Sequence, residues 1–250
     1  MSRRTLARRL AEALPGPKPA EVCKHTLTHP GSASSAPRDI CISTNQTKVL
    51  FNNKKPKRIA CGAFACAYDG PKADTVTKIT YDPSDVGSLL QAQGSQYVPK
   101  VHAAFKLKST VKWHSEKLHR RMSPHAYGVV VERLKGLPVN IASYANCIGT
   151  KAYKLKTSLT TSTALCCEDY AVYPDEKKVC RAVGTSLVEI QHDLHKRGIQ
   201  WKDIHGANLG FGKNAAGKTV LKALDLGMTN TAVQADLPEL AGSKRKRRKK

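Results

Sequence analysis

The sequence predicts an α+β fold in two parts, the first built mainly of β-strands and the second mainly of helices. From residue 46 onward, the first half contains short runs of β-branched and other apolar residues, separated by turns that contain Gly. The second half contains a long apolar stripe with helical spacing. With 250 residues, of which 40% are hydrophobic, the chain is long enough to bury the core of one domain or of two small lobes.

The two ends of the chain differ in composition from its middle. Residues 3–14 (RRTLARRLAEAL) predict a short basic amphipathic helix, and the Pro- and Ser-rich stretch after it predicts a linker. The last seven residues, KRKRRKK, are all basic and predict a disordered tail. We therefore expect a basic helix with its linker, a β-rich part, a helical part and a basic tail, at residues 1–45, 46–135, 136–240 and 241–250.

Several segments of the first half predict strands, and one predicts a helix. KRIACGAFACAYDG predicts two short strands around a turn that contains Gly62 and Phe64. TVTKIT predicts the next strand, because β-branched residues favour extended backbone. DPSDVGSLLQAQG predicts a helix that Asp82 or Ser84 caps. PKVHAAFKLKST and YGVVVERL predict two further strands.

The clearest pattern of the second half is the segment VCRAVGTSLVEIQHDLHKRG, which predicts a long core helix. Gly198 is the residue expected to end this helix, because Gly adopts the left-handed conformation of a C-terminal cap easily. NLGFG and TVLKALDLG then predict a hairpin with NAAG as its turn. The apolar stripe of the helix has spacings of four, four, three and four residues and consists of Val179, Val183, Leu187, Ile190 and Leu194.

The charge of the chain favours anionic partners. A formal net charge of +23 would attract nucleotides, nucleic acid or an acidic protein surface, and it indicates no particular fold. The basic tail alone would bind phosphate backbones without sequence preference. We therefore expect any contact with nucleic acid through the tail to be non-specific.

The compartment is predicted from what the sequence lacks. The N-terminus has no apolar stretch of the secretory type, and no run of 18 apolar residues could span a membrane. None of the eight cysteines forms a C-x-x-C pair, so zinc-ribbon spacing is absent. These features favour a cytoplasmic protein, with no membrane partner, whose thiols are mostly reduced and packed as small buried side chains.

Three polar residues near the end of the chain form the pattern with the clearest chemistry. Asp203 and Asn208 lie five residues apart in a loop directly after the long helix, and Asp225 follows an apolar strand. Each could be an ordinary turn residue, since Asp and Asn favour turns. Together, however, an acid, an amide and a second acid on two adjacent turns supply the oxygen ligands that Mg²⁺ prefers beside phosphate groups. A remaining carboxylate can orient an attacking hydroxyl group.

These residues stand in motifs that resemble those of protein kinases. LHKRGIQWKDIHGANLGF resembles the end of the kinase helix E and the catalytic loop, and LDLG resembles the D-F-G segment. The form Asp-x-His-x-x-Asn, with His205, is similar to aminoglycoside and choline kinases, and the chain as a whole is most similar to the short Ser/Thr protein kinases of T7-like phages. The resemblance implies that Asp203 is the catalytic base and that Asn208 and Asp225 hold Mg²⁺.

The first half resembles the kinase N-lobe in the order of its segments. The resemblance implies that Gly62 and Phe64 lie in the turn that covers the phosphates of ATP, and that Lys78 binds the α- and β-phosphates and takes part in catalysis. It also implies that Glu132 and Leu134 belong to the hinge that binds adenine. Over about residues 57–230, the implied fold is two-lobed, with a β-rich N-lobe and a truncated helical C-lobe.

The sequence departs from the kinase pattern in its motifs. Ala60 and Ala65 occupy the outer Gly positions of the phosphate-covering turn, where Ala permits a less close approach than Gly. Trp201 and Lys202 replace the usual His and Arg; a Trp there can fill an apolar slot, but activation through the Arg is lost.

Two further departures concern helices. The helix expected at residues 84–93 contains Asp85 but no Glu to pair with Lys78, so the lysine must be positioned from elsewhere. The chain after Gly227 is too short for an A-P-E segment or a large helical lobe. The usual platform for a peptide substrate is therefore missing.

Three classes of function follow. The first is an ATP- and Mg²⁺-dependent kinase, which would act on Ser or Thr of a protein of the host cytoplasm or, alternatively, on a small molecule. The second is a pseudokinase that binds a host protein without transfer, which the missing Glu and the Ala-substituted turn would fit. The third, from the charge alone, is a nucleic-acid-binding protein.

Overall fold

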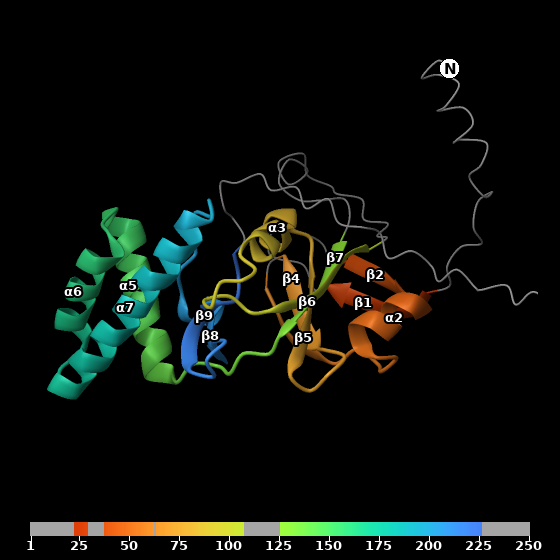
Figure 1. Cartoon of the computed structure of the whole chain (residues 1–250), viewed down its shortest axis with the longest axis horizontal. Helices are drawn as coiled ribbons and strands as arrows, with labels where there is room; N and C mark the ends of the chain where they lie inside the picture. The colour runs from red at the N-terminus through yellow and green to blue at the C-terminus, as the bar shows by residue number, and fades with distance from the viewer. Residues whose placement is uncertain (1–22, 30–37, 63, 108–125, 227–250) are drawn as a thin grey trace, which may run out of the picture.

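The computed structural model describes residues 23–29, 38–62, 64–107 and 126–226. The expected helix at residues 3–14 and the basic tail lie outside these residues. The described chain is an α+β structure in which a five-stranded antiparallel sheet stands between a small N-terminal layer and a group of helices (Figure 1).

The central sheet has the strand order β3-β4-β5-β7-β6 and confirms the strands expected in the first half. In β5 the side chains alternate between buried and partly exposed positions, as expected of a strand with one face on a core. β7 is buried along nearly its whole length because it lies between two neighbours and beneath packed elements on its faces. The strands are β3 (Arg58–Cys61), β4 (Ala65–Asp69), β5 (Thr75–Thr80), β6 (Val101–Leu107) and β7 (Ala126–Glu132).

Helix α3 (Pro83–Gln91) follows β5 directly and confirms the helix expected there. Of the two cap candidates, Asp82 and Ser84, the N-cap is Asp82. Its Oδ1 accepts a hydrogen bond from the Ser84 amide at 2.8 Å. Pro83 stands at the first helical position, where its missing N–H costs nothing. The helix therefore starts within three residues of the strand end.

The expectation of a linker extending to about residue 45 is corrected by the structure of residues 23–29 and 38–51. They form a hairpin of β1 (Cys23–His29) and β2 (Arg38–Ser43), followed by helix α2 (Thr44–Phe51). Ser43 and Gln46 form a capping box that starts the helix. The layer packs on one face of the sheet (Figure 1) through an apolar cluster in which Ile40, Ile42, Leu50 and Phe51 join Cys66, Tyr68 and Ile79.

Three helices form the helical part beside the sheet (Figure 1): α5 (Val139–Leu155), α6 (Leu159–Tyr170) and α7 (Pro174–Lys196). The predicted stripe on α7 is buried from Val183 to Leu194, but Val179 is 36% exposed and is not core. Gly198 adopts the expected left-handed conformation, with φ of +76°, just beyond the end of α7. Among the described helices, none has the length and apolar character needed to cross a bilayer.

The expected hairpin near the end of the described chain is formed by β8 (Leu209–Lys213) and β9 (Thr219–Ala223). Its turn ends at Gly217, with φ of +75°, as the sequence NAAG predicted. The hairpin lies between the helices and the central sheet (Figure 1). Lys135, just after β7, exchanges two backbone hydrogen bonds of 2.8 Å with Phe211, which ties the hairpin to the sheet.

The cysteines contradict the expectation of mostly reduced thiols. The described structure contains three disulfide bonds, and their partners are close only because the chain folds: one bond crosses a hairpin and two join neighbouring helices. The expectation of small buried side chains holds for four of these cysteines, which are at most 2% exposed. The pairs are Cys61–Cys66, Cys147–Cys166 and Cys167–Cys180.

Candidate active site

Lys78 lies in the middle of the central sheet, in strand β5, opposite Ala67 of β4 and Val129 of β7. Its ammonium nitrogen is 2.6 Å from Oδ2 of Asp85 and 3.5 Å from Oδ2 of Asp225. The lysine is 15% exposed. The structure therefore brings together two of the residues that the sequence singled out, although they are far apart along the chain, and adds a third.

Asp85 is a candidate functional residue that the sequence reasoning missed. It stands in the first turn of α3 and is 2% exposed, and its Oδ1 also accepts a long hydrogen bond, 3.4 Å, from the amide of Leu226. It thus contacts both the lysine and the segment that carries Asp225. The sequence did contain a signal for it, an acidic residue in the first turn of the helix expected after β5. Because that helix starts close to the strand, an Asp, which is shorter than the Glu expected there, can reach Lys78. The expectation that this helix offers Lys78 no partner is corrected.

The electrostatics of this group keep the lysine charged. Burial opposes the ammonium charge, but the carboxylates of Asp85 and Asp225 outweigh it and raise the pKa of Lys78 above its ordinary value. Burial raises the pKa of Asp85 to about 7, against the lowering effect of Lys78. One ammonium group between two carboxyl groups leaves a surplus of negative charge when all are ionised. The group is therefore suited to accept a further cation.

Asp203 and Asn208 contact each other directly in the loop between α7 and β8. The Nδ2 group of Asn208 donates to the backbone oxygen of Asp203 at 3.1 Å and to its Oδ2 at 3.0 Å. Asn208 is 9% exposed, whereas the Asp203 side chain is 51% exposed. A buried amide thus orients an accessible carboxylate, and this use of Nδ2 leaves the amide oxygen Oδ1 as the atom that could bind a metal. His205 Nε2 lies 3.5 Å from the same Oδ2.

The β8–β9 hairpin brings Asn208 and Asp225 to the same end of one sheet. Asn208 immediately precedes β8, and its backbone oxygen accepts from the Leu224 amide at 2.8 Å, one residue before Asp225. Trp201 is 2% exposed and donates its indole N–H to the backbone oxygen of Asp225 at 3.2 Å. Trp201 therefore fills an apolar slot and also holds the neighbouring turn.

Helix α5 holds the loop that carries Asp203. Asn146 accepts a hydrogen bond of 2.6 Å from the amide of Gly206. A Cβ atom at Gly149 would lie 1.9 Å from the backbone oxygen of Ile204, so only Gly allows this approach. A Cβ at Gly206 would likewise lie 2.8 Å from Ala142. Sequence reasoning missed this contact because it did not predict α5.

The turn with Gly62 and Phe64 stands at the end of the sheet from which α3 starts. The Gly62 amide donates to the Ala65 oxygen at 2.8 Å, and the Phe64 oxygen accepts from the Tyr81 amide at 3.0 Å. Lys78 pairs with a residue of β4 only two positions from Ala65. The turn is thus near the lysine, as expected, but its Gly62 amide is already used within the hairpin.

Glu132 and Leu134 lie in the segment of residues 132–135, where the chain leaves β7. Their backbone amides differ in whether another backbone group already accepts from them. Within residues 132–135, Leu134 is the residue whose amide makes no backbone hydrogen bond to another described residue. Its side chain faces Gly210 of β8, where a Cβ would lie 2.8 Å from Leu134 Cβ. The other three amides donate to backbone oxygens: Glu132 to Lys100 at 2.8 Å, Arg133 to Asp74 at 2.7 Å and Lys135 to Phe211 at 2.8 Å.

The carboxylate of Glu132 makes a contact that the sequence did not predict. Its Oε2 lies 2.7 Å from the ammonium nitrogen of Lys222, which is 5% exposed, and accepts from the Lys100 amide at 3.1 Å. The pair joins β7 to β9. Its role in the fold is therefore to hold the two sheets together, because a buried ammonium group needs a partner.

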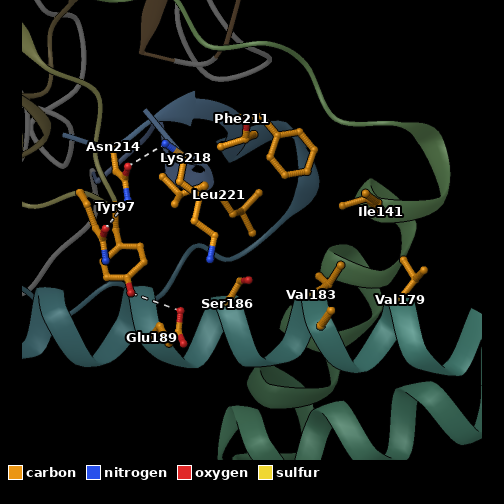
Figure 2. Close-up of a pocket in the computed structure, with 14 residues that line it drawn as sticks. Tyr97, Ile141, Val179, Val183, Ser186, Glu189, Phe211, Asn214, Lys218 and Leu221 are labelled. Carbon is orange, nitrogen blue, oxygen red and sulfur yellow. Dashed lines mark hydrogen bonds between the residues drawn. The ribbon is translucent and has the colours of Figure 1, made fainter. Parts of the chain in front are cut away.

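Two cavities lie beside the site without containing its polar core. A groove of about 490 Å³ runs between α7 and the β8–β9 hairpin, where Tyr97 donates to Glu189 at 3.2 Å and Phe211 and Leu221 line the opposite wall (Figure 2). A cavity of about 750 Å³ adjoins Glu132 and Gly212. Lys78, Asp203 and Asp225 line neither of these two cavities.

The donor set can be compared with the needs of Mg²⁺. Within the described ranges, no three His, Cys, Asp or Glu side chains gather as a metal site. One amide oxygen and one carboxylate at the same hairpin end nevertheless fit Mg²⁺, which commonly takes one or two protein ligands and completes its shell with phosphate oxygens and water.

Comparison with known proteins gives no family for this chain. A scan against models of protein families finds no match. A search of curated proteins finds no match either.

Proposed function

We propose that this chain is an ATP-dependent phosphotransferase of the protein-kinase type. One observation carries the proposal: the Lys78 ammonium group lies 2.6 Å from Asp85 and 3.5 Å from Asp225, and Asp225 adjoins the turn of Asp203 and Asn208. An ammonium group, two metal-binding oxygens and an accessible carboxylate are the groups that phosphoryl transfer needs in one place. The sheet with α3 would be the small lobe, and α5, α6 and α7 the reduced second lobe.

The reaction joins a hydroxyl group to the γ-phosphoryl group of ATP. The hydroxyl oxygen bonds to the γ-phosphorus, the bond from that phosphorus to the β–γ bridging oxygen breaks, and ADP leaves. Asp203 accepts the hydroxyl proton, for which its exposed carboxylate, oriented by Asn208, is suited. Lys78 binds the α- and β-phosphates, and catalysis is mainly positioning and charge neutralisation.

Asn208 and Asp225 would hold Mg²⁺ in this function. When bound, the ion supplies positive charge against the phosphate oxygens. The hydrogen bonds from Asn208 Nδ2 to Asp203 fix the amide so that its oxygen is the available ligand. The indole group of Trp201 fixes the backbone of Asp225.

Adenine would be recognised by the segment that includes Glu132 and Leu134. The Leu134 amide is the available donor, because the neighbouring amides are used toward described residues. The Glu132 side chain supports the segment through Lys222 and does not need to contact the base. Gly210 and Gly212 keep the opposite strand close to this segment.

The acceptor we favour is a Ser or Thr hydroxyl group of a protein from the host cell, with a small molecule as the alternative. The support is the resemblance to the phage kinases and the net charge of +23, which attracts acidic assemblies. Asp85 also removes one argument for a pseudokinase, since Lys78 has a buried acidic partner after all.

The test is transfer of labelled γ-phosphate from Mg-ATP to the protein itself or to proteins of a cell lysate. We expect Asp203→Asn to remove the transfer while Asp169→Asn, a change of an exposed acid on α6, leaves it intact. Equal labelling by wild type and Asp203→Asn would refute the catalytic assignment. Nucleotide binding without transfer in any lysate would support the pseudokinase alternative.

A further inference from the structure

We propose that the Cys61–Cys66 disulfide is a thiol-exchange site that controls the turn over the phosphate-binding lysine, an inference that rests on the proposed function. Cys61 ends β3 and Cys66 lies directly opposite it in β4, so the bond closes the base of the turn. The turn contains Gly62 and Phe64, which are the residues expected to cover the phosphates of ATP.

The three disulfides differ in access. Cys61 belongs to the edge strand β3, whose four residues are all exposed, so a small thiol can approach its sulfur. In the helical part, both cysteines of the Cys167–Cys180 bond are at most 2% exposed, whereas the Cys147–Cys166 bond joins the partly buried Cys147 to a fully buried Cys166. Thiol exchange depends on access to one of the two sulfurs. The hairpin disulfide should therefore react before the Cys167–Cys180 bond.

The bond also affects the hydrogen bonding of the turn. In the described, disulfide-bonded form, the Gly62 amide donates to the Ala65 oxygen, so this N–H is not available to a phosphate oxygen. Oxidation thus holds the turn in a conformation that lacks one potential phosphate donor. Breaking the bond removes the covalent constraint and lets the Gly62 amide rotate toward the nucleotide.

The exchange balances with two thiols of low molecular weight. The thiolate of the first attacks the Cys61 sulfur, the S–S bond breaks, and the Cys66 sulfur leaves as a thiolate that takes up a proton. The second thiol attacks the sulfur of the first and releases the Cys61 thiol. The protein disulfide gains two electrons, and the two small thiols become one disulfide.

The first measurement follows exchange without any activity. The full chain is treated with increasing glutathione, free thiols are alkylated, and the alkylated cysteines are identified by mass spectrometry. We expect Cys61 and Cys66 to be alkylated at glutathione concentrations that leave the Cys167–Cys180 bond intact. Simultaneous or later opening of the hairpin disulfide would overturn the exchange site whether or not the protein is a kinase.

The second measurement is ATP affinity in both redox states, by binding and by the KM for ATP in transfer. We expect reduction to tighten ATP binding about fivefold, the effect of about one added hydrogen bond. Cys61→Ser, a change at an exposed position, should show the tighter value and no response to glutathione. An unchanged affinity after complete alkylation of Cys61 and Cys66, or a Cys61→Ser variant that still responds, would overturn control of the turn. ATP binding in neither state would instead refute the proposed function.

Discussion

The ammonium group of Lys78 and the carboxylate of Asp85 form a buried ion pair of 2.6 Å between the middle of a sheet and the first turn of the next helix. The pair exists because α3 starts within three residues of the end of β5. A side chain as short as Asp can therefore reach the lysine. Asp85 also accepts from the Leu226 amide, so one residue orients both partners of the proposed phosphate site.

Removing the Asp85 carboxylate should impair transfer more than folding. We expect Asp85→Ala to lower kcat/KM for ATP by about 100-fold, the effect of displacing a catalytic group by about 1 Å. Asp169→Ala, which breaks the exposed ion pair with Lys151, should leave kcat/KM unchanged. Steady-state transfer kinetics measure both variants, and thermal unfolding shows whether they are folded. Equal activity of Asp85→Ala and wild type would show that Asp85 does not position the lysine.

Stability should fall with rising pH because of Asp85. Its pKa is about 7 in the folded chain against 3.8 for an ordinary Asp, so the folded state holds the proton more tightly. The resulting stabilisation is complete below pH about 4 and is lost as the pH rises through about 7. Relative to Asp85→Asn, the unfolding free energy of wild type should drop by more than about 1 kcal/mol over this window. Denaturant titrations without nucleotide or Mg²⁺ check this, and parallel pH profiles would contradict it.

The contact between Asn146 and Gly206 should affect turnover rather than ATP binding. We expect Asn146→Leu to lower kcat about tenfold with little change in the KM for ATP, because the loop that carries Asp203 loses a hydrogen bond. Asn146→Asp keeps an accepting oxygen and should retain most of the activity. Asn140→Leu on the same helix is the control, since the Asn140 side chain bonds only to the adjacent Ile141 amide among described residues. A similar loss in all three variants would indicate a general effect on α5.

A methyl group at Gly149 should destabilise the chain. The added Cβ would lie 1.9 Å from the Ile204 oxygen, so the helix and loop would have to separate. We expect Gly149→Ala to cost about 2 kcal/mol, although Ala otherwise favours helix over Gly by about 1 kcal/mol. Gly136→Ala, where no atom lies within 4 Å of the new Cβ, should change the unfolding free energy by less than about 0.5 kcal/mol. Chemical denaturation measures both, and a stabilised Gly149→Ala variant would rule out the close approach.

Removing the metal should weaken nucleotide binding in wild type but not in a variant that lacks the metal ligand. We expect chelation of Mg²⁺ to lower ATP affinity by about tenfold or more, since the ion offsets phosphate charge. Asp225→Asn should bind ATP more weakly and respond little to chelation. Calorimetric titrations with and without Mg²⁺ measure this. Asp169→Asn, a change of an exposed acid on α6, serves as the control, and an equal response of all three proteins would refute Asp225 as a ligand.

The parts of the fold that local patterns determine were predictable. The β3–β4 hairpin, β5, α3, α7 and the β8–β9 hairpin stand where turn residues and apolar spacing indicate them. The β1–β2 hairpin and α2 were missed because the Pro-rich composition around them outweighed the alternation of Ile40 and Ile42. α5 and α6 were missed because small and polar residues, such as Gly149 and Thr163, make much of their contact surface.

The candidate site was predictable where a motif lies within one segment. Asp203 and Asn208 are five residues apart, and the structure joins them by hydrogen bonds. Asp85 was missed because its role depends on the distance between a strand and a helix, which spacing along the chain does not give. The two disulfides between helices were missed for the same reason, since Cys167 and Cys180 meet only when α6 and α7 pack together.

The double hydrogen bond between Lys135 and Phe211 has a mechanical consequence. Together with the Glu132–Lys222 ion pair, it ties the β8–β9 hairpin to the central sheet, and the hydrogen bond from the Ala223 amide to Tyr97 ties the hairpin to the segment before β6. A hinge movement that swings α5, α6 and α7 away from the sheet must therefore bend the connections between the helices and the hairpin. Through such a movement, Asn208 and Asp225 would keep their distance from Lys78.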